Sequence, residues 1–100
     1  MKHNLNGDTL TVELEGELDQ YSSASFRNEL EELLQNEKIR HLNLDLRHLR
    51  FMDSSGIGVV LGRYKTLSRR SGDVTVLHPT DRVDRIFRMS GIYQLINKQP

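Results

Sequence analysis

The sequence contains no cysteine, no tryptophan and only two prolines. Without cysteine the chain can form no disulfide, no thiolate zinc site and no cysteine nucleophile, which is compatible with a cytoplasmic location. No hydrophobic run approaches the roughly 20 residues that a membrane-spanning helix needs. The N-terminal stretch Met1 to Asn4 is mainly polar, so we expect no export signal. These absences together predict a cytoplasmic protein that is not inserted in a membrane.

The chain also lacks an excess of charge of either sign, because 14 Lys and Arg residues balance 14 Asp and Glu residues. Strong binding to nucleic acid usually requires a basic excess on one face, so we expect no direct contact with nucleic acid. One basic cluster leaves a local exception open, and we interpret it as the solvated face of a helix; it comprises Arg63, Lys65, Arg69 and Arg70.

Sequence patterns for catalysis or ligand binding are scarce. The four histidines lack the close spacing of metal ligands, so we expect no metal site; they are His3, His41, His48 and His78. The nucleophile pattern G-x-S-x-G is absent, which argues against a hydrolase. Gly56, Gly58 and Gly62 match neither of the common phosphate-loop patterns, and we interpret them as small residues that let a helix approach a sheet. We therefore expect no catalytic residue and no cofactor.

Hydrophobic periodicity divides the chain into strands and helices. The apolar pattern and a tight turn over residues 6–8 predict strands over residues 2–5, 9–15, 42–46 and 74–77. Apolar stripes at helical spacing predict helices from Ser22 or Ser23 to about Asn36, from the Asp53-Ser54-Ser55 caps to Ser71, and from Thr80 or Asp81 to Ser90. A short basic connector should join residues 46 and 51. A last short helix should cover 92–96, and residues 97–100 should be loose.

This order of elements predicts the fold class. Helices between successive strands imply parallel pairing, and right-handed crossovers that keep moving in one direction leave the helices on one face. The alternation in residues 42–46 agrees, because strands covered on both faces read as continuous apolar runs. We therefore predict a single α/β domain over residues 1–100 with a mixed sheet of four to five strands. The sheet should be mostly parallel, with an antiparallel N-terminal edge strand and helices mainly on one face.

The segment Asp53-Ser54-Ser55-Gly56 stands where a strand ends and a helix begins, which is where open α/β folds place their functional sites. Asp53, Ser54 and Ser55 can each cap the helix, so one of the two hydroxyls is redundant for capping. The spare hydroxyl is a candidate phosphoacceptor, because a phosphate would meet the unpaired N–H groups of the helix N-terminus. It would add about −1.5 to −2 charges beside Asp53 with little damage to the fold. The residue types alone do not distinguish Ser54 from Ser55.

Four stretches of the sequence carry a likeness to a known family. They are Gly16-Glu17-Leu18-Asp19, Ile39-Arg40-His41, Phe51-Met52-Asp53-Ser54-Ser55-Gly56-Ile57-Gly58-Val59-Val60-Leu61-Gly62-Arg63-Tyr64-Lys65 and Met89-Ser90-Gly91. In this order they resemble the anti-sigma-factor antagonists, which are single-domain members of the STAS family. The resemblance covers nearly the whole chain and is most specific in the central block. Within the family it favours the sporulation branch, which acts on the anti-sigma factor of sigma-F.

The resemblance implies a STAS-like fold and a partner switch that is not an enzyme. In this family the second serine of the D-S-S-G block, here Ser55, is phosphorylated by the partner anti-sigma factor, which is also an ATP-dependent serine kinase. The unphosphorylated form binds that kinase and releases the sigma factor, and a metal-dependent serine phosphatase resets the switch. By the same resemblance Asp53, Ser54 and Gly56 belong with Ser55 to the partner-binding surface, and Asp19 lies in the same docking area.

Several alternatives stay open on the sequence. The same fold could serve another sigma pathway, such as the general stress response. The chain could instead be a small nucleotide-binding module that uses Gly56 and the helix N-terminus. A STAS domain that regulates a membrane transporter is disfavoured, because no transmembrane segment accompanies it. The sequence is compatible with either a monomer or a weak dimer.

Overall fold

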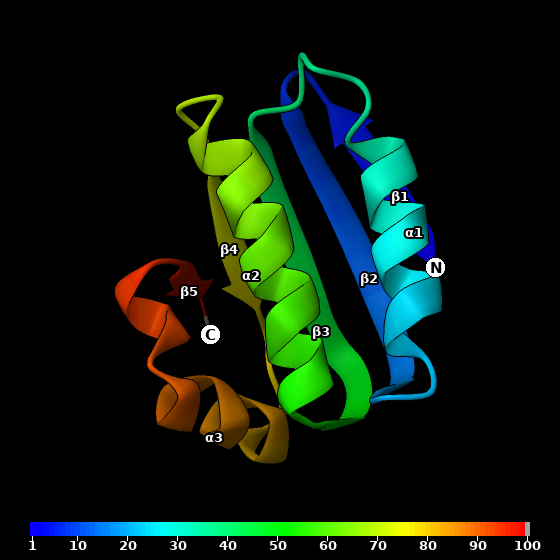
Figure 1. The fold of residues 1–100 in the computed structure, drawn as a ribbon, viewed down its shortest axis with the longest axis vertical. Helices are drawn as coiled ribbons and strands as arrows, with labels where there is room; N and C mark the ends of the chain where they lie inside the picture. Colours follow the sequence, from blue (N-terminus) through cyan, green and yellow to red (C-terminus); the bar gives the residue numbers. More distant parts are fainter. Residues whose placement is uncertain (100) are drawn as a thin grey trace.

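The computed structural model describes residues 1–99, in which helices connect the strands of a sheet (Figure 1). The strands are β1 (Lys2–Asn6), β2 (Thr9–Leu18), β3 (His41–Met52), β4 (Asp73–Leu77) and β5 (Asn97–Gln99). The helices are α1 (Ser23–Leu33), α2 (Ser54–Ser68) and α3 (Asp81–Ser90), followed by the short 3₁₀ helix η1 (Ile92–Gln94). The expectation that the chain end is loose falls partly on Pro100, which lies outside the described residues.

The strands form one mixed sheet in the order β1-β2-β3-β4-β5. β1 pairs antiparallel with β2 across a tight turn at Gly7, whose φ of 64° lies in the left-handed region that glycine adopts without strain. The pairs β2–β3, β3–β4 and β4–β5 are parallel. Because each crossover moves the same way along the sheet, the covering helices share one face, and Figure 1 shows α1 and α2 in front of it. The predicted fold class is therefore confirmed.

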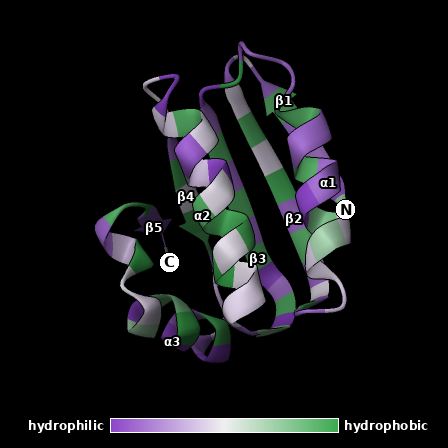
Figure 2. Cartoon of the chain, in the orientation of Figure 1, coloured by the Kyte–Doolittle hydropathy of each residue, from purple (hydrophilic) through white to green (hydrophobic). Residues whose placement is uncertain are grey.

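One face of the sheet and the helices that cover it bury a continuous apolar core. Alternate residues of β2 and β3 are almost fully buried in it, namely Leu10, Val12, Leu14, Leu42, Leu44 and Leu46. Figure 2 shows this alternation as stripes of hydropathy along the two strands. The intervening residues, such as Thr11, Asn43 and Asp45, are half-buried, because the described helices lie on the other side of the sheet.

β2 and β3 extend further than the hydrophobic pattern predicts. Residues 47–50, expected to form a connector, belong to β3, and β2 continues through Gly16 to Leu18. The two strands stay paired to their ends, where Leu18 lies opposite Met52, although the register shifts twice on the way. Such bulges insert extra residues and break strict alternation, so the periodicity stops before the strand does.

The C-terminal end is more ordered than the sequence predicts. Residues 97–99, expected to be loose, form the edge strand β5, and the helix expected over 92–96 is reduced to η1. β5 pairs with β4, with Thr75 opposite Asn97 and Leu77 opposite Gln99. This strand is short and polar, so no hydrophobic alternation in the sequence predicts it.

A cluster centred on the Asp84 carboxylate of α3 holds this end in place. Asp84 accepts a hydrogen bond from the Tyr93 hydroxyl at 2.6 Å and pairs with Lys98 Nζ at 3.0 Å and Arg88 Nε at 3.1 Å. Burial by itself raises the pKa of Asp84, but the hydrogen bonds from Tyr93 and Lys98 and the nearby positive charges outweigh it, so the pKa lies below its ordinary value of 3.8. The ionised carboxylate is therefore the form that stabilises the fold.

Asp84→Asn is expected to lower the free energy of unfolding by about 2 kcal/mol at neutral pH, because it removes charge-assisted hydrogen bonds from a largely buried group. Since the folded pKa is depressed, the contribution of Asp84 is complete above about pH 4 and is lost as the pH falls through the folded value. Urea unfolding at a series of acid pH values should show a steeper loss of stability in the wild type than in Asp84→Asn. Glu32→Gln, which changes an exposed carboxylate of α1, is the control. Parallel acid profiles for the wild type and Asp84→Asn would contradict this role.

Candidate functional site

The candidate site lies where β2 and β3 end side by side. Leu18 and Met52 are paired there, and each strand is followed directly by an aspartate, Asp19 after β2 and Asp53 after β3. The two chain segments are tied together, because Asp53 N donates to Leu18 O at 3.3 Å and Gln20 N donates to Asp53 Oδ2 at 3.3 Å. The expected meeting of Asp19 and the Asp53–Gly56 segment at one edge of the sheet is therefore what the structure shows.

Asp53 alone caps α2. Its Oδ1 accepts a hydrogen bond from Ser55 N at 2.8 Å, and its main-chain carbonyl accepts one from Gly56 N at 3.0 Å. Of the three capping candidates in the sequence, the carboxylate takes the position, so neither serine hydroxyl is needed for the cap. Ser54 is exposed and Ser55 is half-buried at the first turn of the helix. Both hydroxyls are therefore free for another role at this edge.

Asp19 organises the turn between β2 and α1. Its Oδ1 accepts hydrogen bonds from Tyr21 N at 2.9 Å and from Ser22 N at 3.0 Å. The hydrogen bond from Ser22 N is the main reason that the pKa of Asp19 lies below its ordinary value. Burial opposes this shift, and the Tyr21 N–H and the Ser22 hydroxyl add to it. The turn therefore carries a fixed negative charge beside the start of α2.

Ser22 occupies the N-cap position of α1, as expected for one of the two serines, but its side chain does not cap the helix. Its hydroxyl instead donates to Glu17 O at 2.8 Å and accepts from Asp19 N at 3.0 Å. The expected capping by Ser22 or Ser23 is therefore wrong. The reason is that the Ser22 hydroxyl accepts from Asp19 N while the Asp19 carboxylate accepts from Ser22 N, and these hydrogen bonds close the turn before the helix begins.

Gly56 lets the N-terminal turn of α2 pack closely on the strand ends. A Cβ at this position would meet the side chain of Met52 and lie 3.0 Å from Leu18 Cγ. The interpretation that small residues let this helix approach the sheet is therefore confirmed for Gly56. It is wrong for Gly58 and Gly62, where an added Cβ would meet nothing within 4 Å. Because Gly56 is buried against these side chains, a phosphate loop around it gains no support from the structure.

Gly56→Ala is expected to destabilise the protein by about 1 to 3 kcal/mol, because the new methyl group overpacks the contact with Met52 and Leu18. Gly58→Ala is the matched control from the same helix. It should raise the free energy of unfolding by about 0.5 to 1 kcal/mol, because alanine favours the helix and has open space around it. Urea denaturation of both variants measures the difference, and equal effects at the two positions would contradict the packing role of Gly56.

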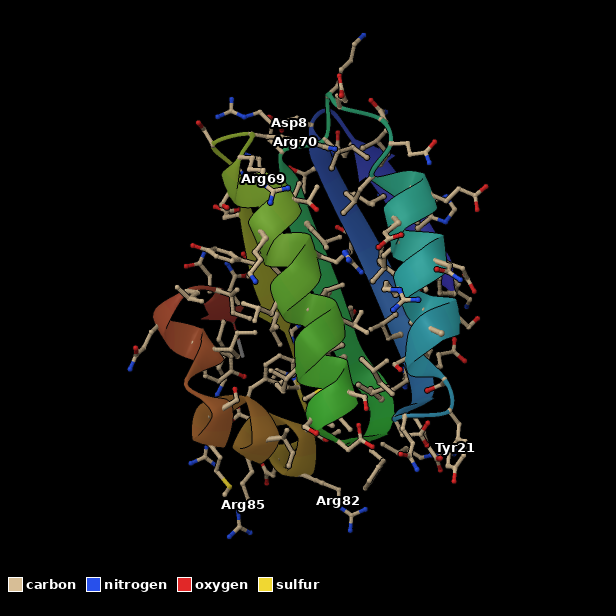
Figure 3. All side chains as sticks on the ribbon, viewed as in Figure 1. Asp8, Tyr21, Arg69, Arg70, Arg82 and Arg85 are labelled. Carbon is tan, nitrogen blue, oxygen red and sulfur yellow. The ribbon has the colours of Figure 1, made fainter. Side chains whose placement is uncertain are left out.

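Exposed side chains occur in the turn beside the N-terminus of α2 and on α3. Tyr21, in the turn held by Asp19, is 86 % exposed, and Met89 of α3 is 77 % exposed. Figure 3 shows Tyr21, Arg82 and Arg85 pointing outward at the end of the molecule where α2 begins. An exposed aromatic ring, arginines and a methionine are the side chains that protein interfaces favour. Sequence reasoning missed these exposed residues, because nothing in the pattern marks Tyr21 or Met89 as exposed.

Residues 1–99 offer neither a candidate metal site nor a helix suited to cross a membrane. No group of three or more His, Asp or Glu side chains in this part of the chain is placed to hold a metal ion. None of the helices described is both long enough and apolar enough to cross a membrane.

Comparison with known proteins agrees with the fold and with the motifs. The STAS domain model matches residues 2–100. The anti-sigma F factor antagonist of Paenibacillus polymyxa is 40 % identical over 87 residues, which cover 87 % of this chain and 74 % of that protein. The anti-sigma-B factor antagonist of Listeria monocytogenes is 32 % identical over 89 residues, which cover 89 % of this chain and 77 % of that protein.

A solved structure extends the likeness to three dimensions. The anti-sigma factor antagonist SpoIIAA in its unphosphorylated form superposes with a TM-score of 0.85 and 27 % sequence identity. The match covers 99 % of this chain and 87 % of that chain. From the family model, the sequence relatives and this fold, the chain belongs to the STAS domain family, among its anti-sigma-factor antagonists.

Proposed function

We propose that residues 1–100 act as a single cytoplasmic STAS domain that binds an anti-sigma factor, and that phosphorylation of Ser55 breaks this contact. The observation that carries the proposal is the cap of α2. Asp53 closes the helix by itself, so the hydroxyls of Ser54 and Ser55 stand at the protein edge without a capping role. The names of the relatives support the kind of partner, because both are antagonists of anti-sigma factors. The description of SpoIIAA as unphosphorylated supports a phosphorylation switch.

The local electrostatics account for a switch that leaves the fold intact. A phosphate on Ser55 lies at the positive end of the α2 dipole, which stabilises negative charge. It also adds charge beside the carboxylates of Asp53 and Asp19, which already lie at this edge. A partner that docks over the three groups must desolvate a concentrated negative charge, and that cost weakens the contact without rebuilding the domain.

The proposal assigns the phosphate to Ser55 through the family resemblance. Ser54 is the more exposed of the two serines, so accessibility alone does not select Ser55. The partner-binding surface is proposed to comprise Asp19, Asp53, Ser54, Ser55 and Gly56, with Gly56 acting by setting the position of the helix end. The domain itself performs no chemistry in this scheme. The partner anti-sigma factor supplies the kinase activity, and a serine phosphatase reverses the reaction.

The proposed pathway is that of the sporulation factor sigma-F, for which the Paenibacillus relative is named. A general stress pathway is the rival, because the Listeria relative is named for sigma-B. Binding measurements against the anti-sigma factors of both pathways from the same cell would decide between them. The factor of the correct pathway should bind at least tenfold more tightly.

Intact-mass spectrometry with site localisation tests the switch. The protein is incubated with ATP and the kinase-type anti-sigma factor from the same cell. One added phosphate on Ser55 is the expected result. A phosphate on Ser54, or a complex that forms without any phosphate transfer, would overturn the assignment of Ser55.

Tyr21→Ala is expected to weaken binding of the anti-sigma factor at least tenfold with little change in stability. The side chain is almost fully exposed in a turn that Asp19 holds through the Tyr21 main-chain N–H, and tyrosine is one of the residues enriched at interface hot spots. Isothermal titration gives the affinity, and urea unfolding shows whether the fold is intact. Leu5→Ala, which changes another exposed apolar side chain on β1, is the control and should bind as the wild type does. Unchanged affinity of Tyr21→Ala would remove Tyr21 from the docking surface.

A further inference from the structure

Arg63 of α2 is a buried arginine whose donors are mostly unsatisfied within the described residues. The residue is only 7 % exposed, so the interpretation of Arg63 as part of a solvated helix face is wrong. Its Nη2 donates to Glu31 Oε1 of α1 at 3.2 Å, whereas Nε and Nη1 are buried without a hydrogen-bond partner among residues 1–99. A guanidinium is always charged and carries donors only, so leaving N–H groups without acceptors in the interior is costly.

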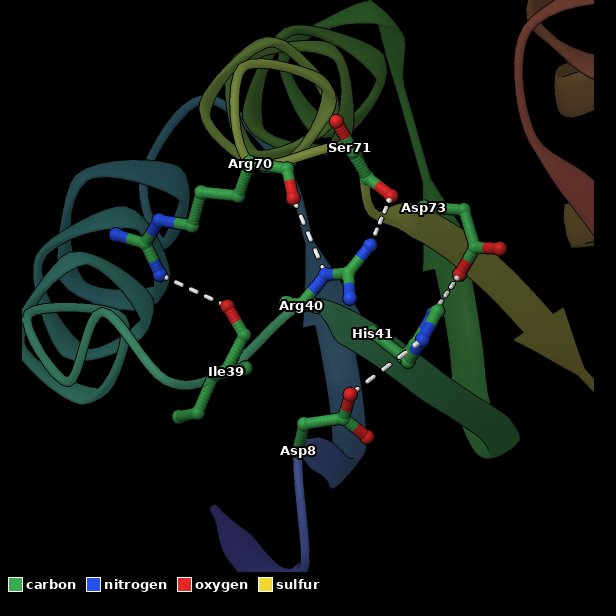
Figure 4. A network of polar contacts seen from close by, with 7 residues as sticks. All are labelled: Asp8, Ile39, Arg40, His41, Arg70, Ser71 and Asp73. Atoms are coloured by element: carbon green, nitrogen blue, oxygen red, sulfur yellow. Dashed lines mark hydrogen bonds and ion pairs between the residues drawn. The ribbon is translucent and has the colours of Figure 1, made fainter.

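Arg70, which follows the C-terminus of α2, is an arginine with a clear structural role and serves as a comparison. Its Nη2 donates to Leu34 O at 2.6 Å, and its Nη1 donates to Ile39 O at 3.0 Å and to Asn36 O at 3.3 Å. Figure 4 shows the bond to Ile39. These bonds satisfy carbonyl groups at and beyond the C-terminus of α1, and Arg70 thereby joins α1 to α2. Arg63 has no comparable set of acceptors in the part of the chain that the structure describes.

A cleft of about 490 Å³ opens beside Arg63 between α1 and α2. Its lining includes Leu34, Gln35, Thr66 and Arg70 as well as Glu31 and Glu37. The volume lies in the range of about 300 to 1,000 Å³ that is typical of small-ligand sites. The Glu31 side chain is 54 % exposed, so it can turn outward from Arg63 into solvent.

The electrostatics around the Arg63 guanidinium favour a negative group against it. Burial is the main reason that the pKa of Arg63 lies below its ordinary value, and Arg27 adds to the effect, while Glu31 opposes it. The single carboxylate of Glu31 therefore does not fully compensate the buried positive charge. Because Glu31 is half exposed, its attraction for Arg63 is also weakened by solvent.

We propose that the cleft between α1 and α2 binds a small oxyanion, a phosphate or carboxylate group, whose oxygens accept hydrogen bonds from Arg63. The planar guanidinium presents two parallel N–H groups, which match two oxygens of such an anion. The anion takes the place of Glu31 against Arg63. The remaining lining combines the neutral polar side chains of Gln35 and Thr66 with the opposite charges of Glu37 and Arg70. This site is separate from Ser55 and does not depend on the proposed partner switch.

Nuclear magnetic resonance of the arginine Nε–H groups tests the proposal on the whole protein. Inorganic phosphate and acetate are titrated separately, with sodium chloride at matched ionic strength as the reference. Phosphate is expected to move the Arg63 Nε–H resonance along a saturable curve and to raise the midpoint of thermal unfolding. Comparing the affinities of phosphate and acetate shows which oxyanion the site prefers.

Two substitutions separate the site from general ionic effects. Arg63→Lys keeps the charge but loses the planar fork, and it is expected to weaken phosphate binding at least tenfold. Arg63→Met removes the buried donors, so it should unfold at or above the wild-type midpoint without responding to phosphate. Arg69→Lys, at an exposed position next to Arg70, is the control and should bind phosphate as the wild type does.

Three results would overturn the proposal. The first is a chloride titration that moves the Arg63 resonance as far as phosphate does. The second is a phosphate response in Arg63→Lys equal to that of the wild type. The third is the absence of any saturable response to either oxyanion, which would mean that water satisfies the Arg63 donors.

Discussion

Ser55→Asp is expected to weaken binding of the anti-sigma factor at least hundredfold, whereas Ser55→Ala should bind like the wild type and accept no phosphate. A hundredfold loss corresponds to about 2.7 kcal/mol, which one negative charge in a desolvated contact can supply. Neither change disturbs the helix cap, because Asp53 and not Ser55 provides the capping side chain. Isothermal titration with the anti-sigma factor measures the affinities, and urea unfolding should show stabilities close to that of the wild type.

The neighbouring serine is the matched control for this prediction. Ser54→Ala should remain a substrate for the kinase and should bind the anti-sigma factor normally. Ser54→Asp places a similar charge one residue away, so it measures how far the effect depends on position. If Ser55→Ala still takes up phosphate at full stoichiometry, or if Ser55→Asp binds as tightly as the wild type, Ser55 is not the switch.

Gly72→Ala is expected to be the most destabilising of the glycine substitutions, at about 3 kcal/mol or more. An added Cβ would clash with the main chain of Arg40, including its carbonyl oxygen. Relief by a side-chain rotation is unavailable, because the obstructing atoms belong to the backbone. The Arg40 carbonyl also accepts a hydrogen bond from Asp73 N at 3.0 Å, which begins the pairing of β3 with β4.

The surroundings of Gly72 leave little freedom to move. Figure 4 shows Arg40 donating from Nε to Arg70 O at 3.2 Å and from Nη2 to Ser71 O at 3.0 Å. His41 Nδ1 lies 2.8 Å from Asp73 Oδ1 in the same network. A shift of the turn that accommodates the methyl group would therefore break several polar contacts together.

Urea unfolding of Gly72→Ala measures this cost, and Gly62→Ala is the control, since an added Cβ meets nothing within 4 Å there. The control should be neutral or slightly stabilising. A stability of Gly72→Ala within about 0.5 kcal/mol of the wild type would mean that the turn relaxes without loss.

Most of the fold could be predicted from local pattern. The strands begin and the helices lie close to where the periodicity predicts, because apolar residues at spacing 2 or 3.6 must face one core. The parallel order and the one-sided helices followed from that sequence of elements. The ends of β2 and β3 could not be predicted, since their bulges break the hydrophobic alternation. β5 could not be predicted either, since its short polar sequence has no hydrophobic alternation.

The position of the candidate site in the fold could be predicted from the sequence, but its detailed contacts could not. The motif put Asp19 and the Asp53–Gly56 segment at one edge, and the parallel sheet brings them there. The sequence offered three capping candidates for α2 without ranking them. The choice of Asp53 depends on the backbone geometry at the end of β3, and the exposure of Tyr21 depends on the turn that Asp19 closes.

The sequence by itself therefore determined the class of fold, the edge that carries the serines and the family likeness, because these follow from residue types and their spacing along one chain. Only the tertiary structure decided which side chain caps α2, why Gly56 and Gly72 must be small, and that Arg63 lies buried beside a cleft. The physical reason is that each of these features depends on close contacts or hydrogen bonds between chain segments that only the folded backbone brings together.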